Sequence, residues 1–400
     1  MRKCLSLIAL LFSVCTGTVA QAADLSPLRI GLIADLTKLS AFSTPSINGV
    51  KMAIDEANAM GGIQGRKVDL IVRDDRGDPA SAQDVVTYMD QAEKVDALLV
   101  HSWSHIAKSL SGYAGHNHIP LLAFWMTIND ATWDNYNPYG FSIDDTPLVQ
   151  ARALVGRVQK LPYKRWYIAG PDVGYARSIS ESFKEELKKQ RPDVEFVGEI
   201  YTPAMKLDAN TVVGAILAKQ PDAVFSPYFG SDLSQYVRIG RKRGLFDTTF
   251  HVNPMAGFPE SMGGIRAEFP PNWLVIGYPG SALRTPEYLA FVDQYKTKYH
   301  THPQWAGTVG YIYAKMLLQA MHDAPNLTHD SVAEQLPKTA IDSPFGHITM
   351  RHIDNRSDMG GWIGIADFSA NDFKLRDFEH YDVNKLSPPD AWIQKKRGQP

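Results

Sequence analysis

The chain has 400 residues, 44% of them hydrophobic, and a formal net charge of −2 at pH 7. A nearly neutral chain of this size has no strong basic field, so we expect no nucleic-acid partner. Single hydrophobic cores rarely grow beyond about 250–300 residues, and the length therefore predicts two lobes.

The first 22 residues have the pattern of a secretory signal peptide. Arg2 and Lys3 precede an apolar run, Leu5–Val14, which is too short to span a bilayer. Ala20-Gln21-Ala22 matches an A-x-A cleavage site. We therefore expect cleavage after Ala22, export to the periplasm and no membrane anchor.

Both cysteines, Cys4 and Cys15, lie inside this segment, so the mature chain has no disulfide. Val14, which precedes Cys15, is not a small residue, and this argues against a lipid anchor. Loss of the signal lowers the basic count from 41 to 39 against 43 acidic residues, a net charge of −4. No later stretch is long and apolar enough to span a membrane.

After the signal, apolar strand patterns alternate with helical patterns. We expect the first long helix to have Thr44 as its N-cap and Pro45 at its first position. Alternation of this kind predicts an α/β fold with parallel sheets covered by helices on both faces. The predicted strands cover residues 28–36, 67–75, 95–100, 119–125, 164–170, 194–201, 221–229, 248–254 and 272–278.

Polar and aromatic side chains follow three of these strands, where each strand ends. The third strand runs directly into His-Ser-Trp-Ser-His within "LLVHSWSHIAKS". Ligands of parallel sheets bind at the carboxyl ends of strands, beside helix N-termini. We therefore expect a binding cleft with aromatic walls and hydroxyl donors, formed by Phe42, Ser102, Trp103, Ser104, Trp125, Met126 and Thr127.

The stretch "IGLIADL…NGVKMAIDEANAMGGIQGRKVDLIVRDDRGDP" resembles the opening of type I periplasmic solute-binding proteins. The similarity is to the leucine/isoleucine/valine-binding proteins of branched-chain amino acid and amide ABC importers. It continues through "IPLLAF", "PDVGYARS", "PDAVFSPYF" and "HPQWAGTVGYIYAKMLLQA", to about Phe368. The order and spacing of these segments carry the resemblance, because no single motif is specific.

The resemblance implies two lobes, each a parallel sheet flanked by helices, joined by three hinge crossovers near residues 144–147, 277–281 and 348–354. Lobe one would combine residues 27–146 with 278–350, and lobe two would combine residues 147–277 with 351–368. Residues 369–400 would form a C-terminal extension. The implied function is capture of a small solute between closing lobes and delivery to a membrane ABC permease, by a monomer without cofactor or catalysis.

Several binding roles also follow from the resemblance. Ser104, with Ser102 as its neighbour, and Thr127 match the hydroxyls that hold a ligand carboxylate. Trp125 or Met126 would supply a nearby backbone carbonyl. The aromatic positions of the family match Phe42, Tyr175 and either Tyr228 or Phe229, and the Trp103 indole would cover an apolar ligand body.

One departure from the family bears on the ligand. Its amino-acid binders place an acidic residue after a strand of lobe two, where "HVNPMAG" here has none. Asp232 and Glu260 are acidic but out of register. A buried ammonium without a counter-charge is costly. We therefore expect a small carboxylate with an aromatic or hydrophobic portion, with a branched-chain amino acid or an amide as the alternative.

Two other functions stay open. The histidines His101, His105, His116 and His118 suggest a metal-dependent hydrolase, although no HExxH motif or acidic partner accompanies them. A periplasmic ligand-sensing subunit on the same fold is the other alternative. For "RDDRGDP" we expect a turn with Asp78 as a helix cap, because the spacing of a calcium loop is absent. Trp305 is expected either in the core or facing the cleft.

Overall fold

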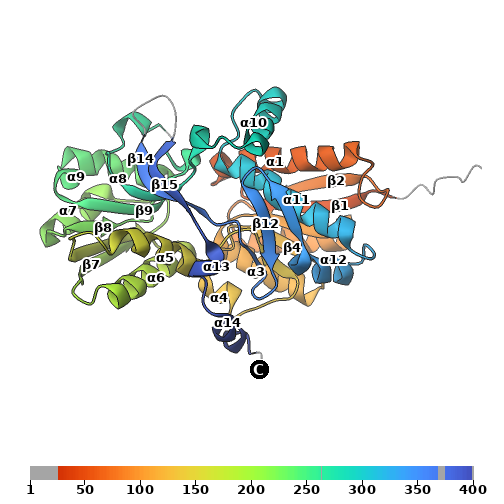
Figure 1. The fold of residues 1–400 in the computed structure, drawn as a ribbon, viewed down its shortest axis with the longest axis horizontal. Helices are drawn as coiled ribbons and strands as arrows, with labels where there is room; N and C mark the ends of the chain where they lie inside the picture. The colour runs from red at the N-terminus through yellow and green to blue at the C-terminus, as the bar shows by residue number, and fades with distance from the viewer. Residues whose placement is uncertain (1–25, 263, 368–373, 399–400) are drawn as a thin grey trace, which may run out of the picture.

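The computed structural model describes residues 26–262, 264–367 and 374–398, so the predicted signal peptide and both cysteines lie outside the described residues. The described chain forms two lobes, each built on its own sheet (Figure 1). The predicted two-lobed α/β fold is confirmed. Within the described ranges, no helix combines the length and the apolar character needed to cross a membrane.

The first lobe has an eight-stranded sheet in the order β11-β12-β13-β5-β4-β3-β1-β2. The strands from β13 to β2 are parallel to one another, while β12 is antiparallel to β13 and β11 to β12. Their bounds are β1 Leu28–Ala34, β2 Val68–Asp74, β3 Ala97–His101, β4 Leu121–Phe124, β5 Gly140–Ser142, β11 Ala340–Ser343, β12 Gly346–Arg351 and β13 Arg356–Ser357.

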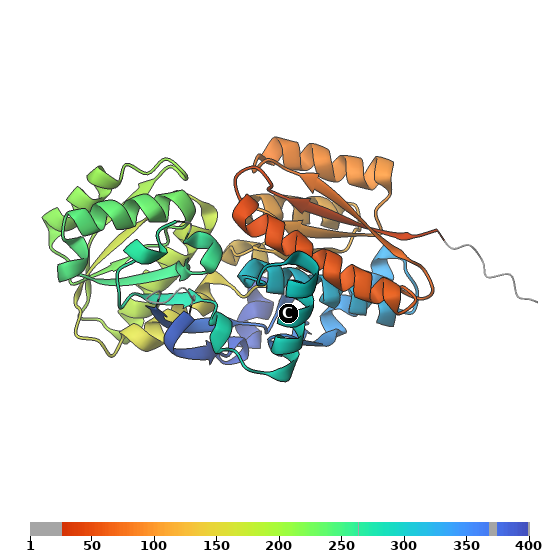
Figure 2. The same ribbon diagram turned by 90° about the horizontal axis from the view of Figure 1, so that it is seen from above.

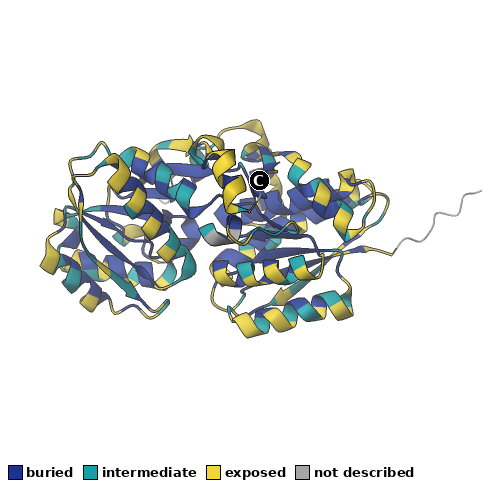
Figure 3. Cartoon of the chain, turned by 90° about the horizontal axis from the view of Figure 1, so that it is seen from below, coloured by how far each residue is buried: buried dark blue, intermediate teal, exposed yellow. Residues whose placement is uncertain are grey.

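Helices cover both faces of this sheet, which explains why β3 reads as a continuous apolar run. Leu98 and Val100 pack with the helices α2 and α3, while Leu99 belongs to the larger core that includes α1 and α11. Figure 3 shows the buried strands between helices that are exposed on their outer sides. The helices of this lobe are α1 Ser40–Ala59, α2 Pro79–Tyr88, α3 Ser104–His116, α4 Asn129–Thr132, α10 Pro286–Tyr299, α11 Trp305–Asp323 and α12 His329–Gln335.

The helix α1 begins at Ser40, five residues earlier than predicted, and Pro45 lies inside it. Thr44 is therefore not the N-cap. Leu39 and Phe42 are both buried in the core, and this burial draws the segment before Pro45 into the helix. Farther along α1, Gly49 permits close contact with α11, since a Cβ there would lie 2.1 Å from the Gly307 carbonyl oxygen. The prediction that Asp78 caps a helix is confirmed, because its Oδ1 accepts the Ser81 N–H at the start of α2.

The second lobe has a seven-stranded sheet in the order β15-β14-β10-β9-β8-β6-β7, parallel from β10 to β7 with β14 and β15 antiparallel. Its strands are β6 Arg165–Pro171, β7 Glu195–Thr202, β8 Ala223–Phe225, β9 Phe250–Gly257, β10 Leu274–Gly277, β14 Gly361–Asp367 and β15 Lys374–Tyr381. Its helices are α5 Pro147–Val158, α6 Gly174–Gln190, α7 Ala209–Lys219, α8 Gly230–Lys242 and α9 Leu245–Thr248.

The chain passes between the two sheets after β5, after β10 and after β13. The third passage differs from the prediction. Residues 348–354 were expected to cross, but β12 and β13 pair within the first sheet, so residues 351–357 belong to lobe one and the crossing follows Ser357. The prediction missed this because Arg356 is charged, and the sequence pattern therefore places it outside a core. In the structure Arg356 is 2% exposed inside the first lobe.

The C-terminal segment is not an appendage. The strand β15 completes the edge of the second sheet. Beyond it, α13 (Val383–Leu386) follows β15, and the Leu386 carbonyl accepts a hydrogen bond from Arg152. The last helix, α14 (Asp390–Lys396), then reaches the first lobe, where Ile393 is buried with Trp133 and Ile353. Figure 1 shows α13 between the two lobes and α14 below it, so residues 383–396 bridge the lobes.

This bridge gives a stability prediction. Replacing the fully buried Ile393 with alanine should lower the free energy of unfolding by about 2–4 kcal/mol, because the site loses a packed side chain and keeps the cavity. Urea titration followed by circular dichroism measures the change. The neighbouring Trp392, 39% exposed, serves as the comparison, and its replacement by alanine should cost less. Equal effects would contradict a docked α14.

Candidate functional site

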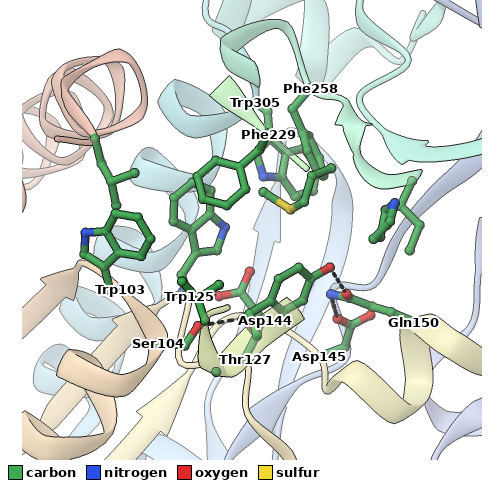
Figure 4. Close-up of a pocket in the computed structure, with 18 of the residues that line it drawn as sticks. Trp103, Ser104, Trp125, Thr127, Asp144, Asp145, Gln150, Phe229, Phe258 and Trp305 are labelled. Atoms are coloured by element: carbon green, nitrogen blue, oxygen red, sulfur yellow. Dashed lines mark hydrogen bonds between the residues drawn. The ribbon is translucent and has the colours of Figure 1, made fainter. Parts of the chain in front are cut away.

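A cavity lies between the lobes, at the carboxyl ends of the parallel strands and beside the crossovers (Figure 4; Figure 2 shows the two lobes from above). Both lobes contribute to its wall. The first lobe supplies Leu39, Ser102, Trp103, Ser104, His105, Trp125, Thr127 and Trp305. The second lobe and the crossovers supply Asp144, Asp145, Gln150, Val173, Gly174, Tyr175, Phe229, Pro254, Met255, Phe258, Ile276, Gly360, Gly361 and Tyr381.

Two hydroxyls form one polar part of the cavity. Ser104 Oγ and Thr127 Oγ1 are 3.1 Å apart, and Figure 4 shows them side by side. Ser104 is the first residue of α3, and Thr127 follows β4. Each hydroxyl has one proton and two acceptor positions, so together they can donate to one anionic group.

Five helices begin at this cavity without an N-cap side chain. The cap positions are Leu39 for α1, Trp103 for α3, Val173 for α6, Phe229 for α8 and Gln304 for α11, and none makes a side-chain capping hydrogen bond. Four of these residues line the cavity, and Trp305, the first residue of α11, does so as well. The N-termini of helices carry unpaired N–H groups and a partial positive charge.

The other described helices of ten or more residues differ. The side chains of Asp78, Thr146, Asp208 and Thr285 cap α2, α5, α7 and α10 with hydrogen bonds to first-turn N–H groups. None of these four residues lines the cavity. Among the described helices of ten or more residues, caps are thus missing at the cavity and present away from it, which is the arrangement expected around an anionic ligand. In α11 the Ala306 N–H donates to Glu260, at 2.7 Å, so this terminus is partly satisfied.

Aromatic rings form the apolar walls. Trp103 of the first lobe and Phe229 of the second have ring centroids 6.0 Å apart, so these rings meet across the cleft. The Trp103 indole N–H donates to Asp35 at 2.7 Å, which fixes its ring. Trp125 has a backbone φ of +76°, a conformation that is uncommon for a bulky residue and that often marks functional sites. Its N–H donates to the carboxylate of Asp144.

Three polar side chains are linked by hydrogen bonds at the hinge end of the cavity. Tyr175 donates from its hydroxyl to Gln150 Oε1 at 2.8 Å, and Gln150 Nε2 donates to Asp145 Oδ1 at 2.7 Å (Figure 4). Asp144 and Asp145 come from the first crossover, directly after β5 and before α5. These hydrogen bonds link Tyr175 of lobe two to Asp145 of the hinge.

Burial dominates the electrostatics of this acidic pair. Desolvation raises the pKa of Asp144 to about 7, opposed by the Trp125 N–H and Arg356 and reinforced by Asp145. Desolvation likewise raises the pKa of Asp145 to about 6, opposed by the Tyr381 hydroxyl, Gln150 and Arg356. The same burial raises the pKa of Tyr175 well above its usual value. The pair is therefore poised to change charge near neutral pH.

The raised pKa of Asp144 predicts a pH dependence of stability. The folded protein keeps this proton up to about pH 7, whereas the unfolded chain loses it near 3.8. The stability that this group contributes is therefore present below that lower value and is lost as pH rises through the folded pKa. Relative to Asp144→Asn, the free energy of unfolding of the wild type should fall between pH 4 and pH 8 by up to about 4 kcal/mol. Urea unfolding of both proteins without ligand measures this difference, and a difference that stays constant or grows with pH would refute it.

The structure brings seven of the ten predicted site residues to the cavity wall. They are Ser102, Trp103, Ser104, Trp125, Thr127, Tyr175 and Phe229. Ser102 itself is fully buried, so its contribution to the wall is small.

Three predicted residues do not line the cavity. Phe42 lies inside α1, 2% exposed, and contacts the Trp125 ring from behind at 4.6 Å. The Met126 side chain belongs to the core beside α3, and its carbonyl accepts a hydrogen bond from Arg356 at 2.7 Å. Tyr228 is buried in the second lobe, where it packs against Tyr236. The strand-end pattern assigned Phe42 and Met126 to the rim, but the core takes both side chains. Of the alternatives Tyr228 and Phe229, which the resemblance implied, Phe229 lines the cavity.

The sequence reasoning missed most of the hinge and second-lobe wall. Asp144 and Asp145 had a usable signal, because two adjacent acids follow a buried strand just before a Thr-Pro helix start. Gln150, one turn into α5, and Tyr381, at the end of an antiparallel edge strand, had none. Trp305 faces the cavity, one of the two placements expected for it.

Asp232 and Glu260 are the acids that could replace the missing lobe-two carboxylate, but both accept backbone hydrogen bonds outside the cavity. Asp232 accepts the N–H groups of Met205 and Leu207, at 2.8 and 3.2 Å. Glu260 accepts the Ala306 N–H of α11. Neither residue lines the cavity, and the "HVNPMAG" segment contributes Pro254 and Met255 to its wall.

The four histidines do not form one site. His101 is fully buried and stacks on Phe124 at 4.4 Å, and desolvation lowers its pKa to about 3. His118 bonds to Tyr139 instead. In the described part of the chain, the one compact group of potential metal ligands is Asp35, Asp74 and Asp75, without a histidine. Backbone N–H groups occupy carboxylate oxygens of all three, so the group holds the β1 and β2 loops together.

Comparison with known proteins agrees with this geometry. The family model described as periplasmic binding protein matches residues 27–370. The chain belongs to this family of periplasmic binding proteins. The Leu/Ile/Val-binding protein of Escherichia coli K12 is 24% identical over 371 residues, covering 91% of this binding protein and 95% of its own length.

Solved structures of similar fold include two with different ligands. The branched-chain amino acid transporter substrate-binding protein LivJ of Streptococcus pneumoniae, in complex with isoleucine, has a TM-score of 0.78 and 21% identity, covering 89% of this binding protein and 99% of that chain. A solute-binding protein of an ABC transporter from R. palustris, in complex with benzoate, has a TM-score of 0.76 and 16% identity, covering 89% and 97%. At these identities the two structures support the fold alone.

Proposed function

We propose that this protein is the extracytoplasmic solute-binding component of an ABC importer and that it captures a small carboxylate between its lobes. The observation that carries the proposal is the set of uncapped helix N-termini around the cavity, together with the Ser104–Thr127 hydroxyl pair. Unpaired N–H groups and helix dipoles favour an anionic group.

The walls favour an apolar body behind that group. Trp103, Trp125, Phe229, Phe258 and Trp305 surround the cavity with aromatic surface. The relatives named above bind leucine, isoleucine and valine or were solved with benzoate, and all of these ligands are carboxylates with an apolar portion. We therefore propose an aromatic or hydrophobic carboxylate, or a branched-chain amino acid, as the ligand.

Closure of the lobes would then mark the loaded protein for its permease. Trp103 and Phe229 meet across the cleft, and Asn129 of the first lobe donates to Ser182 of the second at 2.9 Å. Such contacts depend on the lobes being close, so ligand and closure stabilise each other. We propose that the protein works in the periplasm, as a monomer, and hands its ligand to a membrane ABC permease without catalysing a reaction.

A thermal-shift screen of the ligand-stripped, refolded protein tests this function. The panel contains branched-chain and aromatic amino acids, their deaminated acids, benzoate, urea, short amides and zinc. A ligand that binds only the folded state at 100 times its Kd stabilises it by about 2.7 kcal/mol. We expect carboxylates to raise the melting temperature and urea and zinc to leave it unchanged. A shift with zinc or urea alone would reject the proposal.

A further inference from the structure

The first crossover places two buried carboxyls in the cavity wall. Asp144 and Asp145 are 7% and 4% exposed, and both line the cavity. Asp145 Oδ1 accepts from Gln150, whereas its Oδ2 atom is buried and has no partner with hydrogen-bond geometry among the described residues. The Tyr381 hydroxyl also acts on this carboxyl and lowers its pKa. A buried carboxylate oxygen without a donor is costly, so a donor from the ligand would complete the site.

The charges around the pair are not balanced. Arg356 is the cation that acts on both carboxyls, and it is buried behind them, with its Nη2 atom donating to the Met126 carbonyl and the Thr132 hydroxyl. The next acid, Asp354, pairs with Arg351 at 3.3 Å. When both hinge carboxyls are ionised, one guanidinium therefore faces two negative charges. The cavity side of the pair carries the excess negative charge.

The acidic pair also lies close to the hydroxyl pair. Asp144 accepts the backbone N–H of Trp125, which precedes Thr127 by two residues, and Thr127 bonds to Ser104. Figure 4 shows Asp144 next to Ser104 and Thr127, with Asp145 farther toward Gln150. An anion-binding part and an acidic part are thus neighbours within one cavity. Rings of Trp125 and Tyr175 stand beside them, and aromatic faces attract cations.

We infer that Asp144 and Asp145 form a subsite for a protonated nitrogen of the ligand, so the ligand is a zwitterion whose cationic group points to the hinge. This inference rests on the proposed function, because the carboxylate of the same molecule occupies the hydroxyl pair. The inference also explains why "HVNPMAG" has no acidic residue. The counter-charge for the ligand ammonium comes from the first crossover and not from the second lobe. The ligand would then tie the hinge to the first lobe.

Matched ligand pairs test the subsite in the wild-type protein. L-phenylalanine is compared with 3-phenylpropanoate, and L-leucine with 4-methylpentanoate, because each pair differs only in the amino group. Isothermal titration calorimetry of ligand-stripped protein at pH 8 measures each affinity. For the pair that binds, we expect the amino acid to bind more tightly than the deaminated acid by roughly tenfold or more, the effect of one favourable charge interaction.

Two variants locate the effect. Asp145→Asn keeps the acceptor for Gln150 and removes the charge, and it should reduce the preference for the amino acid to within about threefold, since the lost attraction is electrostatic. Asp69→Asn is the matched control, because Asp69 is exposed on the edge strand β2 and lies outside the cavity. It should keep the wild-type preference. If Asp145→Asn does not fold, the wild-type ligand pairs decide alone.

The outcomes separate this inference from the proposed function. If deaminated acids bind as tightly as the amino acids, or more tightly, the carboxylate function stands and the hinge subsite is refuted. If the preference is wild-type in Asp145→Asn, another group holds the nitrogen and the inference fails. If no carboxylate of either kind binds, while the protein is folded, the proposed function fails and the subsite with it.

Discussion

Replacing Ser104 with aspartate should abolish ligand binding while leaving the protein folded. The new carboxylate would stand at the first residue of α3, among N–H groups that no side chain caps in the wild type. Like charge then opposes the ligand carboxylate, and the hydroxyl that donates to it is gone. We expect the affinity for any carboxylate that binds the wild type to fall by at least about a hundredfold, a loss of roughly 2.7 kcal/mol.

The same substitution should leave the protein folded. The favourable interaction of a carboxylate with a helix N-terminus, about 0.3–1 kcal/mol, is opposed here by the burial of this position and by the negative charge of Asp144 beside it. The melting temperature without ligand should therefore change little. Ser104→Asn is the uncharged control of nearly equal size, and it should retain more of the affinity than Ser104→Asp. Equal loss in both variants would mean that shape and not charge governs this position.

Replacing Arg356 with methionine should have the largest effect on stability. The guanidinium is 2% exposed, donates to the Met126 carbonyl and the Thr132 hydroxyl, and acts on Asp144, Asp145 and Asp354. Removing one partner of a buried charge network leaves the others uncompensated and costs about 3–5 kcal/mol. Urea unfolding measures the loss.

A pH comparison separates this charge effect from lost packing. Without Arg356 the pKa values of the hinge carboxyls rise further, so the loss of stability should be larger at pH 8 than at pH 5. Arg238→Met is the control, because Arg238 forms an exposed ion pair with Glu268 that should contribute less than about 1 kcal/mol. If the loss from Arg356→Met does not change with pH, the arginine serves packing alone.

The strand ends of the first lobe could be predicted from the sequence because the signal there is local. A buried run that stops at His101 and continues with Ser102, Trp103 and Ser104 places these residues at the carboxyl edge of a parallel sheet. Thr127 follows β4 by the same logic. The pattern failed for Phe42, because the packing of a helix turn against the core overrode the boundary that Pro45 suggested.

The hinge and the second lobe could not be derived in the same way. Asp144 and Asp145 line the site because the chain crosses between lobes there, and a crossover leaves no periodic pattern in the sequence. Tyr381 reaches the cavity through an antiparallel pairing of β15 with β14, which depends on tertiary contacts. The absence of N-caps at five helices could not be derived either, because it depends on the true helix starts, as at α1, where Leu39 and not Thr44 holds the cap position.

Comparing a carboxylate ligand with its uncharged isostere tests anion binding at the cavity most directly. The central claim is that uncapped helix N-termini and the Ser104–Thr127 pair hold an anionic group. The carboxylate that gives the largest shift in the thermal screen is paired with its carboxamide, for example L-phenylalanine with L-phenylalaninamide, and both affinities are measured by calorimetry. We expect the amide to bind at least about a hundredfold more weakly, since it loses the charge interaction with the helix termini. Equal affinity for acid and amide would contradict it.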